Sequence, residues 1–223
     1  MDHIPCAIIG FVLVSSIIWL LFKNRQKSDF SKPAKQSLPI LSEWDQKLMA
    51  YHEAGHAICS YYLPEREPLV KITIDPSSDA FGMIKTEPRV HHNETRISLN
   101  STISTFLAGR IAEEMFCNEI TTSCIYDLAA VQAIASDMVI KFGMGGKTKF
   151  MILQNDSRNS IGRQTCQSIE EDIRCIILEA EKATRTVLTE HGKEVTALAQ
   201  ILLNKKTLDQ GEIVHFFHQT GED

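Results

Sequence analysis

The sequence predicts a mainly α-helical domain with one small β-sheet, an α+β fold, preceded by a single transmembrane helix. Three observations support this prediction. An uncharged apolar run opens the chain, one short stretch alternates apolar and polar residues, and helix-like apolar spacing then continues almost to the C-terminus. The 223-residue chain otherwise has an ordinary globular composition, with 43% hydrophobic and 23% charged residues, which suggests one compact domain.

The first element is the apolar run at residues 4–22, which contains no charged side chain. A helix of that length spans roughly 28 Å at about 1.5 Å per residue, close to the hydrocarbon thickness of a bilayer. A cleaved signal peptide is less favoured, because Asp2 precedes the run and bulky side chains end it. Lys23, Arg25 and Lys27 follow directly, so we expect a single-pass protein with its C-terminal domain on the cytoplasmic side.

Charge and cysteine content narrow the possible partners and compartments. The net charge is −5 and no long basic stripe is present, which argues against a nucleic acid partner. Six cysteines without a CxxC pair fit a reducing compartment, where free thiols are expected.

The folded domain is expected at residues 42–219. Before it, residues 23–41 contain serine, lysine and proline without a sustained apolar period, which indicates a short linker. Ser42 stands three residues before Asp45, an arrangement that predicts a helix N-cap, and Pro64 ends that helix.

The remaining elements follow from residue periodicity. Residues 69–75 alternate as in a half-buried strand, and residues 81–86 can pair with them. Helices are then expected at residues 97–116, 127–142, 168–191, 193–203 and 210–217. The third of these begins with a capping-box pattern at Ser168 and Glu171. Residues 145–165 show no clear period and are expected to form a mobile loop.

The helix predicted to begin after Ser42 carries the sequence His52-Glu53-Ala54-Gly55-His56. A spacing of four residues puts both imidazoles on one helix face, where they can hold one zinc ion at roughly 2.0–2.1 Å. Zinc lowers the pKa of a bound water from about 15.7 towards 7, and Glu53 is the candidate base that removes its proton. This pattern is typical of zinc peptidases.

The alternative is a surface helix with two solvated histidines. Gly55 argues against it, because a mid-helix glycine costs about 1 kcal/mol relative to alanine and an exposed face gains nothing from it. We therefore expect another backbone to approach the helix closely at Gly55.

A catalytic zinc ion needs a third protein ligand, and Glu113, Glu114 and Asp127 are the candidates. Adjacent carboxylates on a helix point about 100° apart, so at most one of the two glutamates can face the metal. Asp127 heads a predicted helix, where it can equally serve as a cap or a dipole partner. Spacing alone does not decide between them.

Several motifs in order make residues 45–217 resemble the peptidase domain of the FtsH-type, membrane-bound, ATP-dependent zinc metalloproteases. The matching segments are residues 52–57, 109–114, 121–122, 127–128, 138–139 and 143–144. The resemblance implies a zincin-like helical peptidase domain with one catalytic zinc ion. It implies His52, His56 and Asp127 as zinc ligands and Glu53 as the general base.

The same resemblance assigns Arg110, Glu113 and Glu114 to a supporting helix. Two positions depart from the family pattern, because Ser123 and Ala108 stand where glycine is usual or common. Both departures change local backbone freedom near the expected substrate groove.

A larger departure concerns ATP. Family members carry an ATPase module between membrane and peptidase, and the linker here is too short for a domain of about 100 residues. Residues 143–148 superficially resemble a phosphate loop, but that motif needs a glycine where Lys141 stands, so ATP binding is not expected there. We expect an endopeptidase acting on unfolded or membrane-associated proteins, as a homo-oligomer (a hexamer by resemblance) or with a separate ATPase. The rival hypothesis is a non-catalytic, membrane-anchored interaction subunit of full-length relatives, against which the intact Glu53 argues.

Overall fold

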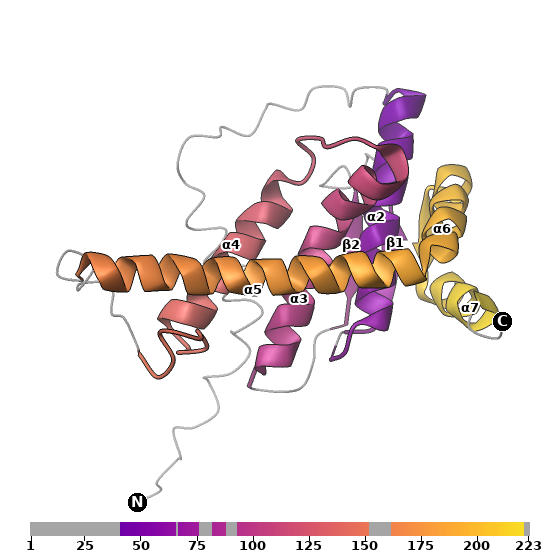
Figure 1. Ribbon diagram of the computed structural model, residues 1–223. Coiled ribbons are helices and arrows are strands. Elements are labelled where there is room, and N and C mark those ends of the chain that lie inside the picture. Colours follow the sequence, from indigo (N-terminus) through magenta and orange to yellow (C-terminus); the bar gives the residue numbers. More distant parts are fainter. Residues whose placement is uncertain (1–40, 66, 76–81, 88–92, 152–161, 221–223) are drawn as a thin grey trace, which may run out of the picture. The chain divides into compact units, whose positions relative to one another are not determined.

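The computed structural model describes residues 41–65, 67–75, 82–87, 93–151 and 162–220. Its central helix, α2 (Glu43–Tyr62), packs mainly against α3 (Arg96–Ala112) and α6 (Gly192–Lys205), as Figure 1 shows. The predicted cap of α2 is confirmed: Ser42 Oγ accepts a hydrogen bond from Asp45 N at 3.1 Å, and Asp45 Oδ2 accepts one from Ser42 N at 3.2 Å. The predicted end of this helix is confirmed as well.

Helices α2 and α3 meet most closely at Gly55. A Cβ atom at this position would lie 2.6 Å from the carbonyl oxygen of Ala108 and 2.6 Å from Cβ of Ala112. Any side chain at Gly55 would therefore push α3 away from α2. The expected close approach of another backbone is confirmed, and it places α3 directly beside the two histidines of α2.

Further helical elements follow α3 in the chain. They are the π-helical turn η1 (Glu113–Cys117), α4 (Ile125–Ile140), α5 (Arg163–Glu190) and α7 (Gln210–Thr220). Figure 1 shows α5 running across α3 and α4, with which it packs. The residues that α5 buries recur every four positions, which places them along one stripe that faces the core: Asp172, Ile176, Ala180, Thr184 and Leu188.

The start of α5 differs from the prediction. The helix begins at Arg163 after Gly162, and Ser168 lies inside it, so the predicted capping box is wrong. Its first turns carry only exposed or half-buried residues, which add no apolar period to the sequence.

The sheet has three antiparallel strands in the order β2-β1-β3. They are β1 (Leu69–Thr73), β2 (Met83–Thr86) and β3 (Thr207–Asp209). Ile72 of β1 pairs with Ile84 on one side and with Leu208 on the other. The predicted pairing of the first two strands is confirmed, whereas β3 is too short to show a period of its own.

Asp172 of α5 organises part of the segment that was expected to be a loop. Its buried carboxylate accepts hydrogen bonds from Lys147 N at 2.9 Å, Thr148 N at 2.8 Å and Thr148 Oγ1 at 2.7 Å. A bound phosphate at residues 143–148 would need these same amide donors. A protein carboxylate engages them instead, so residues 147–148 are bound to α5 and their amides are not available to a phosphate.

These findings confirm a mainly helical fold with one small antiparallel sheet. In the part of the chain that the structure describes, no helix is both long enough and apolar enough for a bilayer crossing. The transmembrane helix predicted at residues 4–22 lies outside the described residues and, with the linker, stays a prediction.

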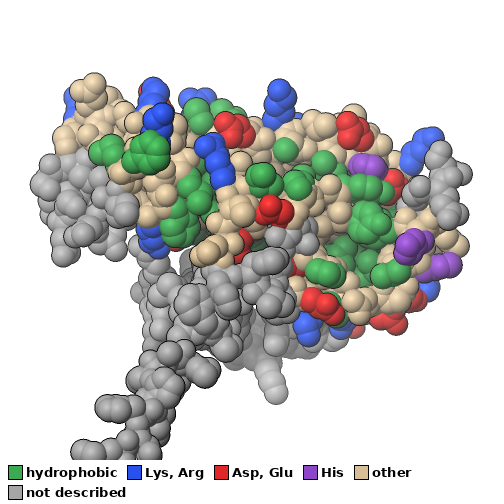
Figure 2. Space-filling model, turned by 90° about the horizontal axis from the view of Figure 1, so that it is seen from below, with side chains coloured by type: hydrophobic (Ala, Val, Ile, Leu, Met, Phe, Trp, Pro, Cys, Tyr) green, Lys and Arg blue, Asp and Glu red, His purple; other side chains and the backbone are tan. Residues whose placement is uncertain are grey.

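The surface drawn in Figure 2 shows acidic, basic and hydrophobic side chains intermixed, with neither charge gathered into a continuous patch. Charge on this face does not single out a partner. The buried polar cluster between α2 and α4 is the stronger indication of function.

Candidate metal centre

Three side chains from two helices meet at one point. His52 and His56 come from α2, Asp127 comes from the first turn of α4, and all three offer ligand atoms within 4.8 Å of one another. The two Nε2 atoms lie 3.0 Å apart, and Asp127 Oδ2 lies 3.2 Å from that of His52 and 3.4 Å from that of His56. The structure thus brings together the residues that the resemblance implies as zinc ligands.

This triangle fits a zinc ion. Tetrahedral zinc with bonds of about 2.0–2.1 Å separates its ligand atoms by about 3.3–3.4 Å. The observed separations of 3.0, 3.2 and 3.4 Å are close to that value. Imidazole nitrogen and carboxylate oxygen are also ligand types that zinc prefers.

The outer nitrogens of the two imidazoles explain why a cation belongs between them. His52 Nδ1 lies 2.7 Å from Glu113 Oε1, and His56 Nδ1 lies 2.6 Å from the carbonyl oxygen of Thr105. Since these oxygens only accept, both Nδ1 atoms carry protons, and both neutral rings direct Nε2 lone pairs into the same space. Two lone pairs 3.0 Å apart repel unless a proton or a metal ion lies between them.

Without a metal ion, a proton serves this purpose. Burial alone would lower the pKa of His52, but hydrogen bonds to Asp127 and Glu113 and the nearby charges raise it to about 10. Burial would likewise raise the pKa of Asp127, but hydrogen bonds from the two imidazoles hold it well below its usual range. The site therefore attracts positive charge strongly.

Glu53 is buried and lies against the start of the sheet. A Cβ atom built on Gly82, the residue before β2, would overlap Glu53 Oε1. Burial raises the pKa of Glu53, and the charges of His56 and His52 oppose that rise. The carboxylate is thus held in a confined, poorly solvated position beside the two histidines.

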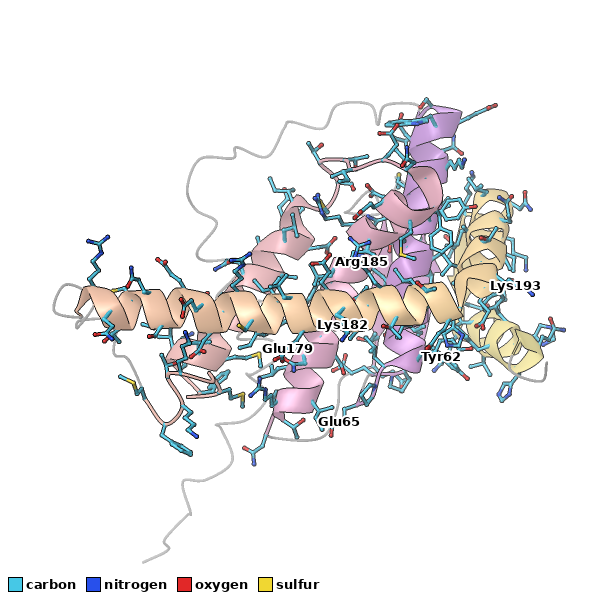
Figure 3. The ribbon with its side chains drawn as sticks, viewed as in Figure 1. Tyr62, Glu65, Glu179, Lys182, Arg185 and Lys193 are labelled. Carbon is cyan, nitrogen blue, oxygen red and sulfur yellow. The ribbon has the colours of Figure 1, made fainter. Side chains whose placement is uncertain are left out.

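The three candidates for the third ligand have different surroundings. Asp127 joins the histidines, whereas Glu113 contacts the outer nitrogen of His52. Glu114, one residue further on, forms an ion pair with Arg185 of α5 at 2.8 Å. Figure 3 marks Arg185, which lies on α5 together with Lys182. Spacing along the sequence could not separate these cases, because each depends on which helix lies opposite.

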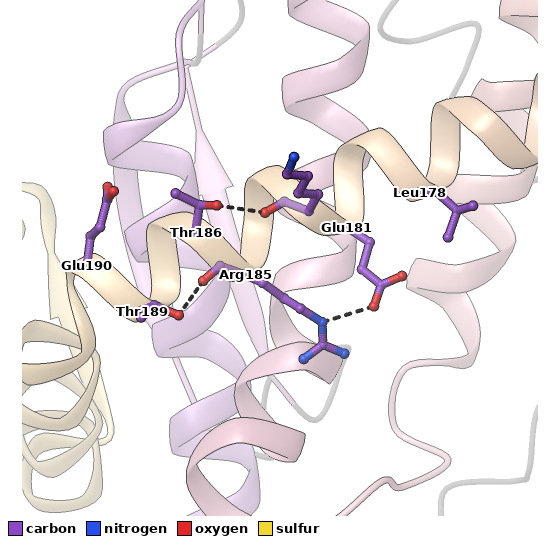
Figure 4. Close-up of a pocket in the computed structure, with 7 residues that line it drawn as sticks. Leu178, Glu181, Arg185, Thr186, Thr189 and Glu190 are labelled. Atoms are coloured by element: carbon purple, nitrogen blue, oxygen red, sulfur yellow. Dashed lines mark hydrogen bonds and ion pairs between the residues drawn. The ribbon is translucent and has the colours of Figure 1, made fainter.

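A cavity of about 480 Å³ lies elsewhere, along the outer side of α5. Figure 4 shows Glu181, Arg185 and Thr189 among its lining residues, all of them on this one helix. None of the three metal-site residues lines it, so it is separate from the candidate metal centre.

The sequence did not point to Gly109, which the structure places against the site. A Cβ atom there would lie 2.5 Å from His52 Nε2 and 2.6 Å from His56 Nε2. The glycine of α3 therefore leaves the space in which the imidazoles and a metal ion fit. Its place within the matched segment at residues 109–114 was the one available signal.

Comparison with known proteins agrees with this geometry. A model described as peptidase family M41 matches residues 39–216. The ATP-dependent zinc metalloprotease FtsH of Nitrosococcus oceani is 31% identical over 195 residues, covering 82% of this chain and 30% of that protein. The mitochondrial inner membrane m-AAA protease component AFG3L2 of Mus musculus is 32% identical over 181 residues, covering 78% of this chain and 23% of that protein.

A third relative, the ATP-dependent zinc metalloprotease YME1L1 of Mus musculus, is 34% identical over 184 residues, covering 81% of this chain and 25% of that protein. The chain thus spans less than a third of the length of these relatives. The resemblance inferred from the ordered motifs is confirmed.

Proposed function

Because the chain belongs to peptidase family M41, we propose that it is a zinc-dependent endopeptidase in which His52, His56 and Asp127 hold one catalytic zinc ion. One observation carries the proposal. The two Nε2 atoms lie 3.0 Å apart while both Nδ1 atoms are committed to oxygen acceptors, which is the arrangement of a preformed cation site. The names of relatives such as FtsH and YME1L1 as zinc metalloproteases support zinc as that cation.

In this proposal the zinc ligands, the general base and the residues that orient the imidazoles have separate roles. A zinc ion held by the three ligands would act as a Lewis acid towards water and the substrate carbonyl. Glu53 accepts the proton of the attacking water and returns it to the leaving nitrogen. Burial favours this role, because it raises the pKa of Glu53 towards the range in which a carboxyl group can both take and give a proton. Glu113 and the carbonyl of Thr105 keep the two imidazoles turned towards the site.

We also propose that the peptidase is anchored in a membrane by the helix predicted at residues 4–22, with its domain on the cytoplasmic side. The uncharged run and the basic residues after it support this proposal. Unfolded or membrane-associated proteins are the proposed substrates. An unfolded segment is needed because folded domains are stable by about 5–15 kcal/mol and seldom expose cleavable chain.

The relatives named above include ATP-dependent enzymes, and this chain covers under a third of their length. A separate ATPase or a homo-oligomer, with a hexamer as the form that the resemblance implies, belongs to the proposal as a partner because these relatives are named as ATP-dependent. ATP added to the purified chain should leave cleavage of an unstructured peptide unchanged. Clear stimulation by ATP alone would contradict this part.

The central test separates metal binding from catalysis. Glu53→Gln should retain zinc and lose cleavage by at least about 100-fold, because general-base catalysis contributes roughly 10²–10⁴. Asp127→Asn should weaken zinc retention, and Glu179→Gln, at an exposed glutamate of α5, serves as the matched control. Zinc content is measured by metal analysis and cleavage with an unstructured peptide.

Each alternative has its own outcome in that test. Wild-type protein that stays metal-free under zinc-replete conditions would reject the zinc site. Zinc-loaded Glu53→Gln that cleaves at the wild-type rate would place the base elsewhere. Zinc content with no turnover in the wild type would favour the interaction-subunit alternative.

A further inference from the structure

The carboxylate that orients His52 is itself held by two hydroxyl groups from a different part of the chain. Glu113 is almost fully buried, and its Oε1 accepts from His52 Nδ1 at 2.7 Å and from Ser123 Oγ at 2.6 Å. Its Oε2 accepts from Thr121 Oγ1 at 2.9 Å and from Thr121 N at 3.3 Å. Four donors therefore fill the four acceptor positions of one carboxylate.

These bonds leave Ser123 little freedom. The Oγ atoms of Thr121 and Ser123 lie 2.8 Å apart, and Ser123 N donates to Thr121 Oγ1 at 3.2 Å. Each hydroxyl has a single proton, and Glu113 is the acceptor for both. Ser123 is otherwise exposed, so its side chain serves no packing purpose in the core.

The position of Ser123 in the chain gives these bonds their significance. Residues 121–123 form the turn that leads into α4, and Asp127 lies in the first turn of that helix. Glu113 Oε1 thus contacts both His52 on α2 and the turn that precedes α4, the helix that carries Asp127. The same oxygen contacts one candidate zinc ligand directly and, through Ser123, the turn four residues before another.

We propose that Ser123 is a positioning residue of the zinc site, because its hydroxyl fixes the Glu113 carboxylate that connects His52 to the start of α4. This inference rests on the proposed zinc function. Ser123 is also a position at which the sequence departs from the FtsH-type pattern, where glycine is usual. A glycine lacks the hydroxyl, so this contact is a feature of the present chain.

The test compares Ser123→Ala with Ser123→Thr in the full chain. Loss of orienting partners around metal ligands typically weakens metal affinity about 10- to 100-fold. Removing one of the four donors to Glu113 should weaken zinc binding by a smaller factor, about 3- to 10-fold. Ser123→Thr retains the hydroxyl and should restore most of the affinity. Ser136→Ala is the matched control, because that hydroxyl lies within α4 and accepts a hydrogen bond from Gln132 Nε2 at 3.3 Å, away from Glu113 and the candidate ligands.

Four measurements distinguish positioning from a general loss of structure. Zinc affinity is measured by competition with a chromophoric chelator, and the visible spectrum of the cobalt-substituted protein reports ligand geometry. Ser123→Ala should change both, and it should lower kcat more than it changes KM for an unstructured peptide. The metal-free variant should stay folded and melt within a few degrees of the metal-free wild type, because Glu113 keeps three of its four donors.

Two outcomes would overturn the inference. Wild-type affinity and an unchanged cobalt spectrum in Ser123→Ala would show that the hydroxyl positions nothing. A weaker affinity that merely follows a loss of folded protein would assign Ser123 a structural role instead. Failure of the proposed function looks different, because the wild type itself would then fail to bind zinc or to cleave.

Discussion

Gly82→Ala should disable Glu53 without disturbing the zinc ligands. The added Cβ would overlap Glu53 Oε1 and lie 2.8 Å from its Cδ, whereas ordinary contacts begin near 3.4 Å. The carboxylate must therefore move by on the order of 1 Å to restore normal contacts. A misplacement of that size can cost about 100-fold in rate, so we expect kcat to fall by about that factor.

The fold should tolerate this substitution. Gly82 does not have a positive φ angle, so alanine can adopt its backbone conformation. The atoms that must move belong to the end of a side chain and not to backbone, and Glu53 is outside the triangle of candidate ligands. Zinc affinity should accordingly stay within about twofold of the wild type, since no ligand is displaced.

The assay is steady-state cleavage of an unstructured fluorogenic peptide by fully zinc-loaded protein, with the zinc content of each sample measured. Gly162→Ala is the control, because a Cβ there would meet no atom within 4 Å. It should cleave like the wild type. Gly82→Ala protein that retains both zinc and the wild-type kcat would refute the reasoning that Glu53 needs this confined position.

Three further predictions concern the metal site and its surroundings. Gly109→Ala should release zinc, because its Cβ would lie 2.5 Å from His52 Nε2 and 2.6 Å from His56 Nε2. Metal analysis after dialysis measures the zinc content, and full zinc retention would contradict the prediction. Asp172→Ala should lower the thermal midpoint by roughly 5–10 °C, because the amides of Lys147 and Thr148 and the hydroxyl of Thr148 lose their acceptor, which costs about 2–3 kcal/mol of stability. Calorimetry of the metal-free protein measures the midpoint, and an unchanged midpoint would count against the contact. Zinc binding should release about one proton near pH 7.5, because the metal-free pKa of His52 is raised to about 10 and Nε2 must lose its proton. Apparent zinc affinity should therefore rise with pH up to about pH 10, by at most about tenfold per pH unit. Calorimetry measures the proton release as a difference in binding enthalpy between two buffers of different ionisation enthalpy, and equal enthalpies would show that His52 was already neutral.

Much of the helical fold could be predicted because its signals are local. Ser42 and Asp45 contact each other across three residues, so the start of α2 is visible in the sequence. The start of α5 at Arg163 gives no such signal, since no side chain caps it and residues 163–170 are only exposed or half-buried. Strand β3 (Thr207–Asp209) is a strand because β1 lies beside it, and three residues carry no period of their own.

The sequence by itself determined that the imidazoles of His52 and His56 share one helical face, because a spacing of four residues is local geometry, and that Glu53 lies between them in the sequence. Spacing left open which distant carboxylate joins them, and the resemblance to the FtsH-type family implied Asp127. Only the tertiary structure decided the contacts themselves: Asp127, 75 residues from His52, completes the cluster, Glu113 contacts the outer nitrogen of His52, and Glu114 pairs with Arg185. The physical reason is that these contacts depend on how α2, α3 and α4 pack together, which is not local in the sequence; the approach of α2 to α3, for example, depends on the absence of a side chain at Gly55.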